Sequence, residues 1–224
     1  MENRLILMIN RFVKRCIDIV GSLIGLLILA IVFVPIAIAI KLDSPGSIFF
    51  TQTRYGKQGQ PFQIRKFRSM VANAEELKSA VPLEVQGTNR QDSRVTRVGR
   101  FLRRTALDEL PQFWNVLVGQ MSLVGTRPLS SDELLYYGEE PLQQVTVKPG
   151  ITSESLVVGC YAVKDWEQIV ALDQRYQSRW NPLSDFVIFG KAIAIILARI
   201  FFGESLDNEN SAKKRECKAD FKVN

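Results

Sequence analysis

Two adjacent carboxylates, Asp108 and Glu109, lie in the stretch TALDELPQFWN (105–115), directly after the arginine-rich run RVTRVGRFLRR (94–104). A carboxylate can bind Mg²⁺, which prefers oxygen ligands. It can also act as a nucleophile that forms a covalent phospho-intermediate. Neighbouring guanidinium groups are suited to bidentate contacts with phosphate. The pattern therefore predicts phosphate chemistry at these two acids. The structural alternative is a first helical turn with a favourable negative charge.

Composition narrows the chemistry further. The 224 residues carry a net charge of +6, which favours anionic partners, and they include no histidine. Catalytic triads that depend on histidine and zinc sites ligated by histidine are therefore excluded. The three cysteines are isolated and odd in number, which supports neither a disulfide framework nor a thiolate zinc site and favours a reduced, cytosol-facing location. No aromatic-interleaved basic motif appears, so nucleic acid is not a predicted partner.

The segment around the acids reads as one amphipathic helix over residues 107–118. Its apolar residues share one arc at 100° per residue, and Asp108, Gln112 and Asn115 occupy the polar arc. Thr105 with Asp108 fits a capping box, and Gly119 fits the helix end. A nearby loop, MSLVGTRPL (121–129), holds an arginine before a proline and predicts a fixed guanidinium suited to phosphate.

Other elements of the chain must position these groups, and the most prominent of them is a long apolar segment. Residues 17–40 are long enough to reach across a hydrocarbon core of ~30 Å. Pro35 lies well inside this stretch and predicts a kink. Basic residues flank both ends, so the positive-inside rule gives a spanning helix no orientation. We therefore expect a re-entrant helix-break-helix that turns back at Pro35, with a single spanning helix as the alternative.

The remaining chain predicts a small catalytic domain. We expect a β-hairpin over 51–70, a helix over 71–79, a surface loop over 80–93 and a helix over 94–104. Residues 183–203 are apolar except for three charged residues that share part of one face, which predicts an interfacial helix or, alternatively, a buried core helix. The predicted organisation is a membrane element (1–42), a cytosol-facing domain (43–203) and a charged, disordered tail (204–224).

Several long motifs resemble the bacterial sugar transferase family, the monotopic phosphoglycosyl transferases, in their minimal catalytic form. They are KRCID (14–18), IKLDSPGSIFFTQTRYGKQGQPFQIRKFRSM (40–70), DSRVTRVGRFLRRTALDELPQFWNVLVGQMSLVGTRP (92–128) and VKPGIT (147–152). The resemblance implies a mostly helical α+β fold, monotopic in the membrane, with an N-terminal re-entrant helix-break-helix, a small β-hairpin and interfacial amphipathic helices.

The resemblance also implies an activity. Members transfer a sugar-1-phosphate from a UDP-sugar to undecaprenyl phosphate, release UMP, and initiate exopolysaccharide, O-antigen or glycoconjugate assembly at the cytoplasmic face of the bacterial inner membrane. Their Asp-Glu dyad and Mg²⁺ map onto Asp108, as nucleophile and metal ligand, and Glu109. The residues implied to pair with the acids or bind phosphate and substrate are Lys66, Arg68, Arg104, Arg127, Pro128 and Asp185.

The chain departs from the family pattern at two places. Thr126 stands where members commonly have proline, and SESLVV (153–158) replaces the usual continuation after PGIT. These departures motivate an alternative function, a non-catalytic membrane scaffold or anionic-lipid-binding protein of the same fold. The sequence names no particular sugar, and it leaves both a monomer and a homo-oligomer open.

Overall fold

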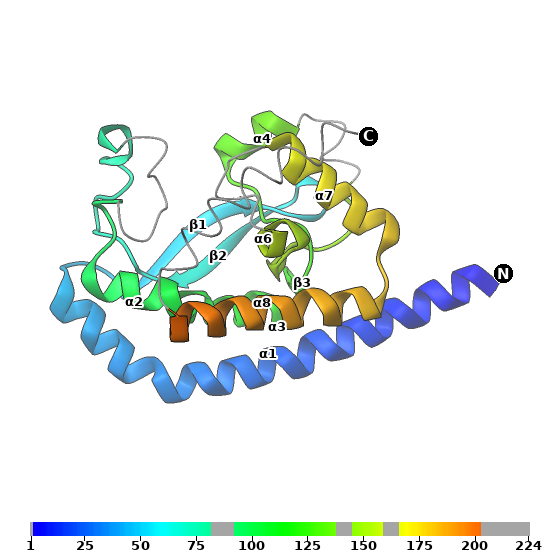
Figure 1. The fold of residues 1–224 in the computed structure, drawn as a ribbon, viewed down its shortest axis with the longest axis horizontal. Helices are drawn as coiled ribbons and strands as arrows, with labels where there is room; N and C mark the ends of the chain where they lie inside the picture. Colours follow the sequence, from blue (N-terminus) through cyan, green and yellow to red (C-terminus); the bar gives the residue numbers. More distant parts are fainter. Residues whose placement is uncertain (1, 82–91, 138–144, 159–165, 203–224) are drawn as a thin grey trace.

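A computed structural model of the chain describes residues 2–81, 92–137, 145–158 and 166–202 (Figure 1). The described part is mostly helical and holds two small sheets, which confirms the predicted α+β class. The predicted tail (204–224) and most of the predicted loop (80–93) lie outside the described residues. The elements are α1 (Glu2–Asp43), β1 (Phe49–Tyr55), η1 (Lys57–Gly59), β2 (Pro61–Phe67), η2 (Lys78–Ala80), α2 (Arg97–Thr105), η3 (Leu107–Glu109), α3 (Gln112–Leu117), β3 (Ser122–Val124), α4 (Ser131–Tyr137), β4 (Gly150–Thr152), α6 (Glu154–Val158), α7 (Trp166–Arg179) and α8 (Pro182–Phe202).

Helix α1 runs along one side of the molecule and bends before its C-terminal end (Figure 1). It is the one helix of the described residues that is long and apolar enough to cross a membrane. Pro35 lies inside it, and the helix continues through this residue to Asp43. A proline removes one backbone donor and clashes with the preceding turn, which accounts for a bend without a break. The structure therefore contains a bent helix, and the re-entrant topology stays a prediction.

Several polar side chains of α1 bind the rest of the chain. Lys14 donates to the Val124 carbonyl at 2.9 Å, and the buried Asp18 carboxylate accepts from the Leu123 amide at 2.9 Å. At the other end, Asp43 accepts a 2.8 Å hydrogen bond from the amide of Val98 in the first turn of α2. Both halves of α1 are therefore fastened to the same folded body.

The predicted hairpin is confirmed. Strands β1 and β2 pair antiparallel, with Phe49 opposite Phe67. The turn between them uses two left-handed residues, Gln58 (φ 55°) and Gly59 (φ 70°). Phe33 of α1 stacks against both phenylalanines, with ring centroids 5.8 and 6.2 Å away. The strands thus carry the residues of β2 to a fixed place above α1.

Two predictions about helices are wrong. Residues 71–79 form turns that lead into η2 and no α-helix. The predicted helix over 107–118 is divided: α2 ends at Thr105, Ala106 is left-handed (φ 55°), and a 3-10 turn separates it from α3. The Thr105 hydroxyl donates to the Phe101 carbonyl within α2 and caps no following helix. A left-handed alanine is rare for an L-residue, so the composition of the segment gave no signal for it.

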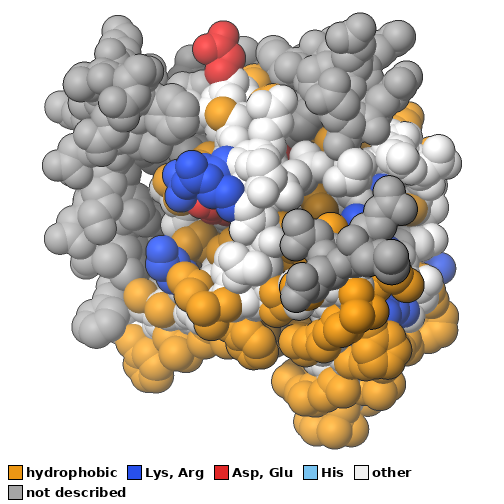
Figure 2. Space-filling view, turned by 90° about the vertical axis from the view of Figure 1, so that its right-hand side faces the viewer, with side chains coloured by type: hydrophobic (Ala, Val, Ile, Leu, Met, Phe, Trp, Pro, Cys, Tyr) orange, Lys and Arg blue, Asp and Glu red, His pale blue; other side chains and the backbone are white. Residues whose placement is uncertain are grey.

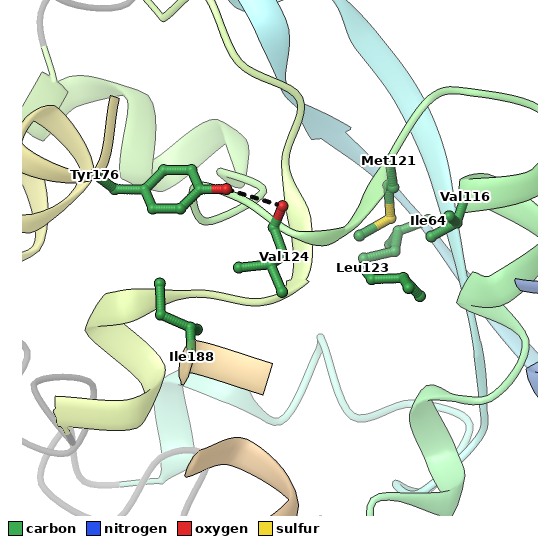
Figure 3. Packing of buried hydrophobic residues seen from close by; sticks show 7 residues of the cluster. All are labelled: Ile64, Val116, Met121, Leu123, Val124, Tyr176 and Ile188. Carbon is green, nitrogen blue, oxygen red and sulfur yellow. Dashed lines mark hydrogen bonds between the residues drawn. The ribbon is translucent and has the colours of Figure 1, made fainter. Parts of the chain in front are cut away.

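The larger hydrophobic core lies between the hairpin, α3, β3 and the two C-terminal helices. Its buried members are shown in Figure 3: Ile64, Val116, Met121, Leu123, Val124, Tyr176 and Ile188. A second cluster joins the C-terminal part of α1 to β2 and α2 through Ile36, Ile40, Phe67 and Leu102. The two cores fix β2 and α2 relative to α1.

Helix α8 confirms the predicted C-terminal helix and lies alongside α1 (Figure 1). Ile188 and Ala192 are buried against the body of the protein, whereas most of its large apolar side chains are exposed. The exposed apolar residues of α8 are Leu183, Phe186, Val187, Phe189, Ile193, Leu197, Ile200 and Phe201. Figure 2 shows that apolar side chains dominate the lower surface of the molecule. This exposure fits the interfacial interpretation better than the buried one.

Candidate active site

The dyad occupies the 3-10 turn between α2 and α3. Because Ala106 is left-handed, the chain reverses after α2, and the turn buries Asp108 to 7% exposure. Glu109 is more exposed, with 31% of its side chain accessible. Adjacent residues of the turn thus give one desolvated carboxylate and one that faces partly outward.

The outward carboxylate is paired with a lysine of the hairpin. Lys66 Nζ lies 2.6 Å from Glu109 Oε1. This is the pairing between Lys66 and the acids that the sequence resemblance implies. Asn115 of α3 donates to the Gln63 carbonyl of β2 at 2.7 Å, so the strand that carries Lys66 is tied to the helix that follows the dyad.

Arg103 is the arginine whose charge acts on Asp108, where it opposes the rise of the pKa. The sequence pointed to the neighbouring Arg104 and not to Arg103. Arg103 Nε donates to Ser69 Oγ at 2.9 Å. Burial lowers the pKa of Arg103, and the charge of Asp108 partly offsets that lowering. The predicted Arg104 is exposed instead. Arg103 and Arg104 are adjacent in the same basic run. The sequence alone does not show which of the two side chains lies nearer to Asp108, because this depends on where α2 ends.

The electrostatic environment of Asp108 is unusual for an aspartate. Burial, followed by the charge of Glu109, raises the pKa of Asp108 to about 7, although Lys66 and Arg103 act in the opposite direction. A buried carboxylate whose pKa is raised above its ordinary value is typical of functional sites. Its ionised form would be stabilised by an additional cation.

Gln112 is a second residue that the sequence analysis missed. It lies on the polar arc of the segment, yet it is only 2% exposed, and among the described residues its buried side-chain NH₂ has no hydrogen-bond partner. An unsatisfied buried donor costs about 1–3 kcal/mol and calls for a functional or structural reason. Its place at the start of α3, four residues after Asp108, is suited to a donor for a substrate oxygen.

The other predicted phosphate-binding arginines are engaged in the protein. Arg68 donates to the carbonyls of Ser44 (2.7 Å) and Pro45 and braces the turn after α1. Arg127 Nη2 lies 2.7 Å from Glu133 Oε1, and Arg54 approaches the other oxygen of the same carboxylate at 3.2 Å. Burial alone would raise the pKa of Glu133, but Arg127, the Ser130 amide and Arg54 together lower it.

Pro128 and Asp185 are placed with structural partners. The Pro128 carbonyl accepts a hydrogen bond of 3.3 Å from Arg54. Asp185, at the start of α8, contacts Lys14 at 2.5 Å, the Tyr176 hydroxyl at 2.7 Å and Trp180 Nε1 at 3.1 Å. The structure therefore brings Lys66 and Arg103 to the dyad and places Asp185 in a junction between α1 and α8.

The two departures from the family pattern are well ordered parts of the fold. Thr126 is buried, and its carbonyl accepts a 2.9 Å hydrogen bond from Gly150. Residues 154–158 form α6, where the Ser153 hydroxyl accepts from the Leu156 amide at 3.2 Å.

The donor set at the dyad fits Mg²⁺ with few protein ligands. Within the described ranges, no three His, Cys, Asp or Glu residues come together as a metal cluster. Mg²⁺ commonly binds through one or two carboxylates, several waters and substrate phosphates. The desolvated carboxylate of Asp108, with Glu109 beside it, matches that pattern.

The sequence matches those of known proteins over most of its length. The family described as bacterial sugar transferase matches residues 9–199. Galactosyl transferase CpsE of Streptococcus agalactiae is 40% identical over 82% of this chain and 42% of its own length. UDP-glucose:undecaprenyl-phosphate glucose-1-phosphate transferase of Escherichia coli is 41% identical over 80% of this chain and 39% of its own. The uncharacterized sugar transferase EpsL of Bacillus subtilis is 33% identical over 88% of this chain and 91% of its own.

The chain thus spans about two fifths of the first two relatives and nearly all of the third. The match includes most of α1, the hairpin, the dyad and most of α8. The chain belongs to the bacterial sugar transferase family.

Proposed function

We propose that the chain is a phosphoglycosyl transferase that moves a sugar-1-phosphate from a UDP-sugar to undecaprenyl phosphate and releases UMP, as a membrane step of exopolysaccharide or glycoconjugate synthesis. The observation that carries the proposal is the buried Asp108 beside Glu109, Lys66 and Arg103. The names of the relatives, which include undecaprenyl-phosphate sugar transferases, supply the substrate class.

The chemistry proceeds in two displacements at phosphorus. A carboxylate oxygen of Asp108 attacks the phosphorus that carries the sugar, and the bond from this phosphorus to the bridging oxygen breaks, so UMP leaves with the bonding pair. A phosphate oxygen of the lipid then attacks the aspartyl phosphosugar, forms a diphosphate bond and frees the carboxylate. The Arg103 and Lys66 charges stabilise the negative charge that develops on the transferred group.

Asp108 would hold Mg²⁺ with help from Glu109, and the bound ion would neutralise phosphate charge. Lys66 keeps Glu109 oriented through their 2.6 Å contact. Gln112 offers its unpartnered NH₂ group to a substrate oxygen. The proposal is supported by the contact of Lys66 with Glu109 and by the burial of Gln112 four residues after Asp108.

We infer a monotopic, re-entrant association with the cytoplasmic face of the inner membrane. The support is that Lys14 and Asp18 in the first half of α1, and Asp43 at its end, all contact one folded body. A helix that spanned the bilayer would carry its two ends to opposite sides. The exposed apolar side chains of α1, α3 and α8 would then lie in the membrane.

The decisive experiment measures UMP release and covalent labelling. The purified chain is given Mg²⁺, undecaprenyl phosphate and either UDP-glucose or UDP-galactose, the sugars suggested by the names of relatives. We expect Asp108→Asn to lower turnover by at least about 10³-fold and to abolish labelling by the UDP-sugar, since the nucleophile is lost. Asp132→Asn, a change at an exposed aspartate of α4, should leave the rate within about twofold.

Retention of turnover and labelling in Asp108→Asn would contradict the mechanism. If the unaltered chain releases no UMP with these two or with a wider panel of UDP-sugars, the result favours the scaffold or anionic-lipid-binding alternative.

A further inference from the structure

A group of basic side chains gathers at the end of α3, away from the dyad at its beginning. An ideal Cβ on Gly119 would lie 3.3 Å from Lys148 Nζ and 3.5 Å from an Nη atom of Arg15. The hairpin turn lies close by, since Gly56 packs against Pro149. Arg15, Lys57 and Lys148 thus come from three different segments of the chain, and we call them the basic cluster.

The cluster has more positive charge than its surroundings neutralise. Arg15 donates to the Val116 and Leu117 carbonyls, each at 2.7 Å. Across the part of the chain that the structure describes, the Lys148 ammonium makes neither a hydrogen bond nor an ion pair. Burial, followed by the charge of Arg15 and then those of Lys57 and Lys14, lowers the pKa of Lys148, and Asp18 only partly opposes this.

The nearby acids are already engaged. Asp18 accepts hydrogen bonds from the Ser122 hydroxyl and the Leu123 amide, both at 2.9 Å. Asp185 of α8 is paired with Lys14 at 2.5 Å. An external anion would therefore find a positively charged place with an unused ammonium donor.

Exposed apolar side chains lie near the basic cluster. Val118 precedes Gly119 and is 49% exposed, and Phe12, one turn before Arg15 on α1, is 72% exposed. Figure 2 shows Lys and Arg side chains directly above the apolar lower surface. Basic groups just above an apolar face lie at the level of lipid headgroups when that face enters a bilayer.

We propose that Arg15, Lys57 and Lys148 bind the phosphate of an anionic phospholipid headgroup. Lys148 donates the direct charge-assisted hydrogen bond, while Arg15 and Lys57 supply charge. The site is separate from the reacting groups, because Asp108 precedes α3 and Gly119 follows it. The proposal does not depend on the transferase reaction, and its test contains no sugar nucleotide.

The test counts lipids bound to the full chain in a nonionic detergent by native mass spectrometry. The protein is titrated with dihexanoyl phosphatidylglycerol, dihexanoyl phosphatidylcholine or inorganic phosphate. We expect the anionic lipid to bind more tightly than the other two. Lys148→Gln should weaken that binding about fivefold, the value expected for one lysine at an anionic surface, and Lys148→Arg should restore it.

The matched control is Lys191→Gln, which removes an equal charge from an exposed position on α8. This variant should bind the anionic lipid as the unaltered chain does. Equal losses in the Lys148→Gln and Lys191→Gln variants would overturn the proposal in favour of an effect of net charge. Binding of inorganic phosphate as tight as that of phosphatidylglycerol would overturn the lipid assignment in favour of a site for a soluble anion.

Discussion

Burial of the Asp108 carboxylate lowers the stability of the folded protein when the carboxylate is ionised. Its pKa of about 7 exceeds the ordinary aspartate value, so the folded state holds a proton that the unfolded chain releases between about pH 4 and 7. Stability is therefore lost as the pH rises through this window. A desolvated acid of this kind is maintained for chemistry at a cost to the free energy of unfolding.

The raised pKa of Asp108 predicts that Asp108→Asn stabilises the protein in a pH-dependent way. The gain in free energy of unfolding should be on the order of 2–4 kcal/mol above pH 8, should shrink as the pH falls from about 7 to 4, and should vanish toward about pH 3, where the aspartate is protonated in both states. Thermal unfolding in detergent with a metal chelator measures it. Asp132→Asn should show no such gain, because Lys78 lowers the pKa of that exposed aspartate. An Asp108→Asn gain of equal size at pH 4 and pH 8 would contradict the assignment.

The sequence placed Lys66 with the acids, and the structure pairs it with Glu109. It pointed to Arg104, which is exposed, and passed over Arg103, whose charge acts on Asp108. Helical periodicity separates polar from apolar sides without saying which side meets the protein. In α3 the polar Gln112 and Asn115 are buried, while Trp114 is 45% exposed on the apolar side. A membrane-associated helix can direct its apolar face to lipid, so the usual assignment of that face to the core fails here.

At the scale of elements, α2 is positioned by a close approach of two backbones. Gly99 in its first turns lies so near the Ser69 carbonyl that a Cβ would overlap it. The Thr96 amide donates to that carbonyl at 3.2 Å, and Arg103 reaches the Ser69 hydroxyl. This contact between α2 and the end of the KFRSM segment sets the direction in which the dyad turn leaves the helix.

Gly99→Ala should therefore displace α2 and damage both stability and transfer. We expect a loss of about 2–3 kcal/mol, since the overlap is with backbone that has little room to shift, together with at least about tenfold lower turnover. Unfolding midpoints and UMP release are measured on the same preparation. Gly190→Ala in α8 is the matched control, because among the described residues no atom beyond its chain neighbours and the nearby backbone of α8 lies within 4 Å of the added Cβ. Its midpoint should stay level or rise. A stable, fully active Gly99→Ala variant would contradict the proposed role of this approach.

At the scale of the whole molecule, the length and contacts of α1 favour a helix that lies along the membrane-facing side of the protein over a helix that spans the bilayer. Its 42 residues extend over about 63 Å, roughly twice the hydrocarbon thickness. A straight span would detach either the Lys14 and Asp18 contacts or the Asp43 contact from the folded body. The bend at the proline-containing part of α1 lets both sets of contacts exist together.

This arrangement predicts that both ends of α1 are cytoplasmic, a topology that labelling of single cysteines can test. Cys16, Cys160 and Cys217 are replaced by serine, and Glu2→Cys or Ser47→Cys is introduced. Because one folded body holds both halves of α1, a membrane-impermeant maleimide should label neither cysteine in intact spheroplasts and both in inside-out vesicles. A periplasmic loop cysteine in another inner-membrane protein controls for access of the reagent. Labelling of Glu2→Cys in intact spheroplasts would place the N-terminus in the periplasm and require α1 to leave the body that it packs against.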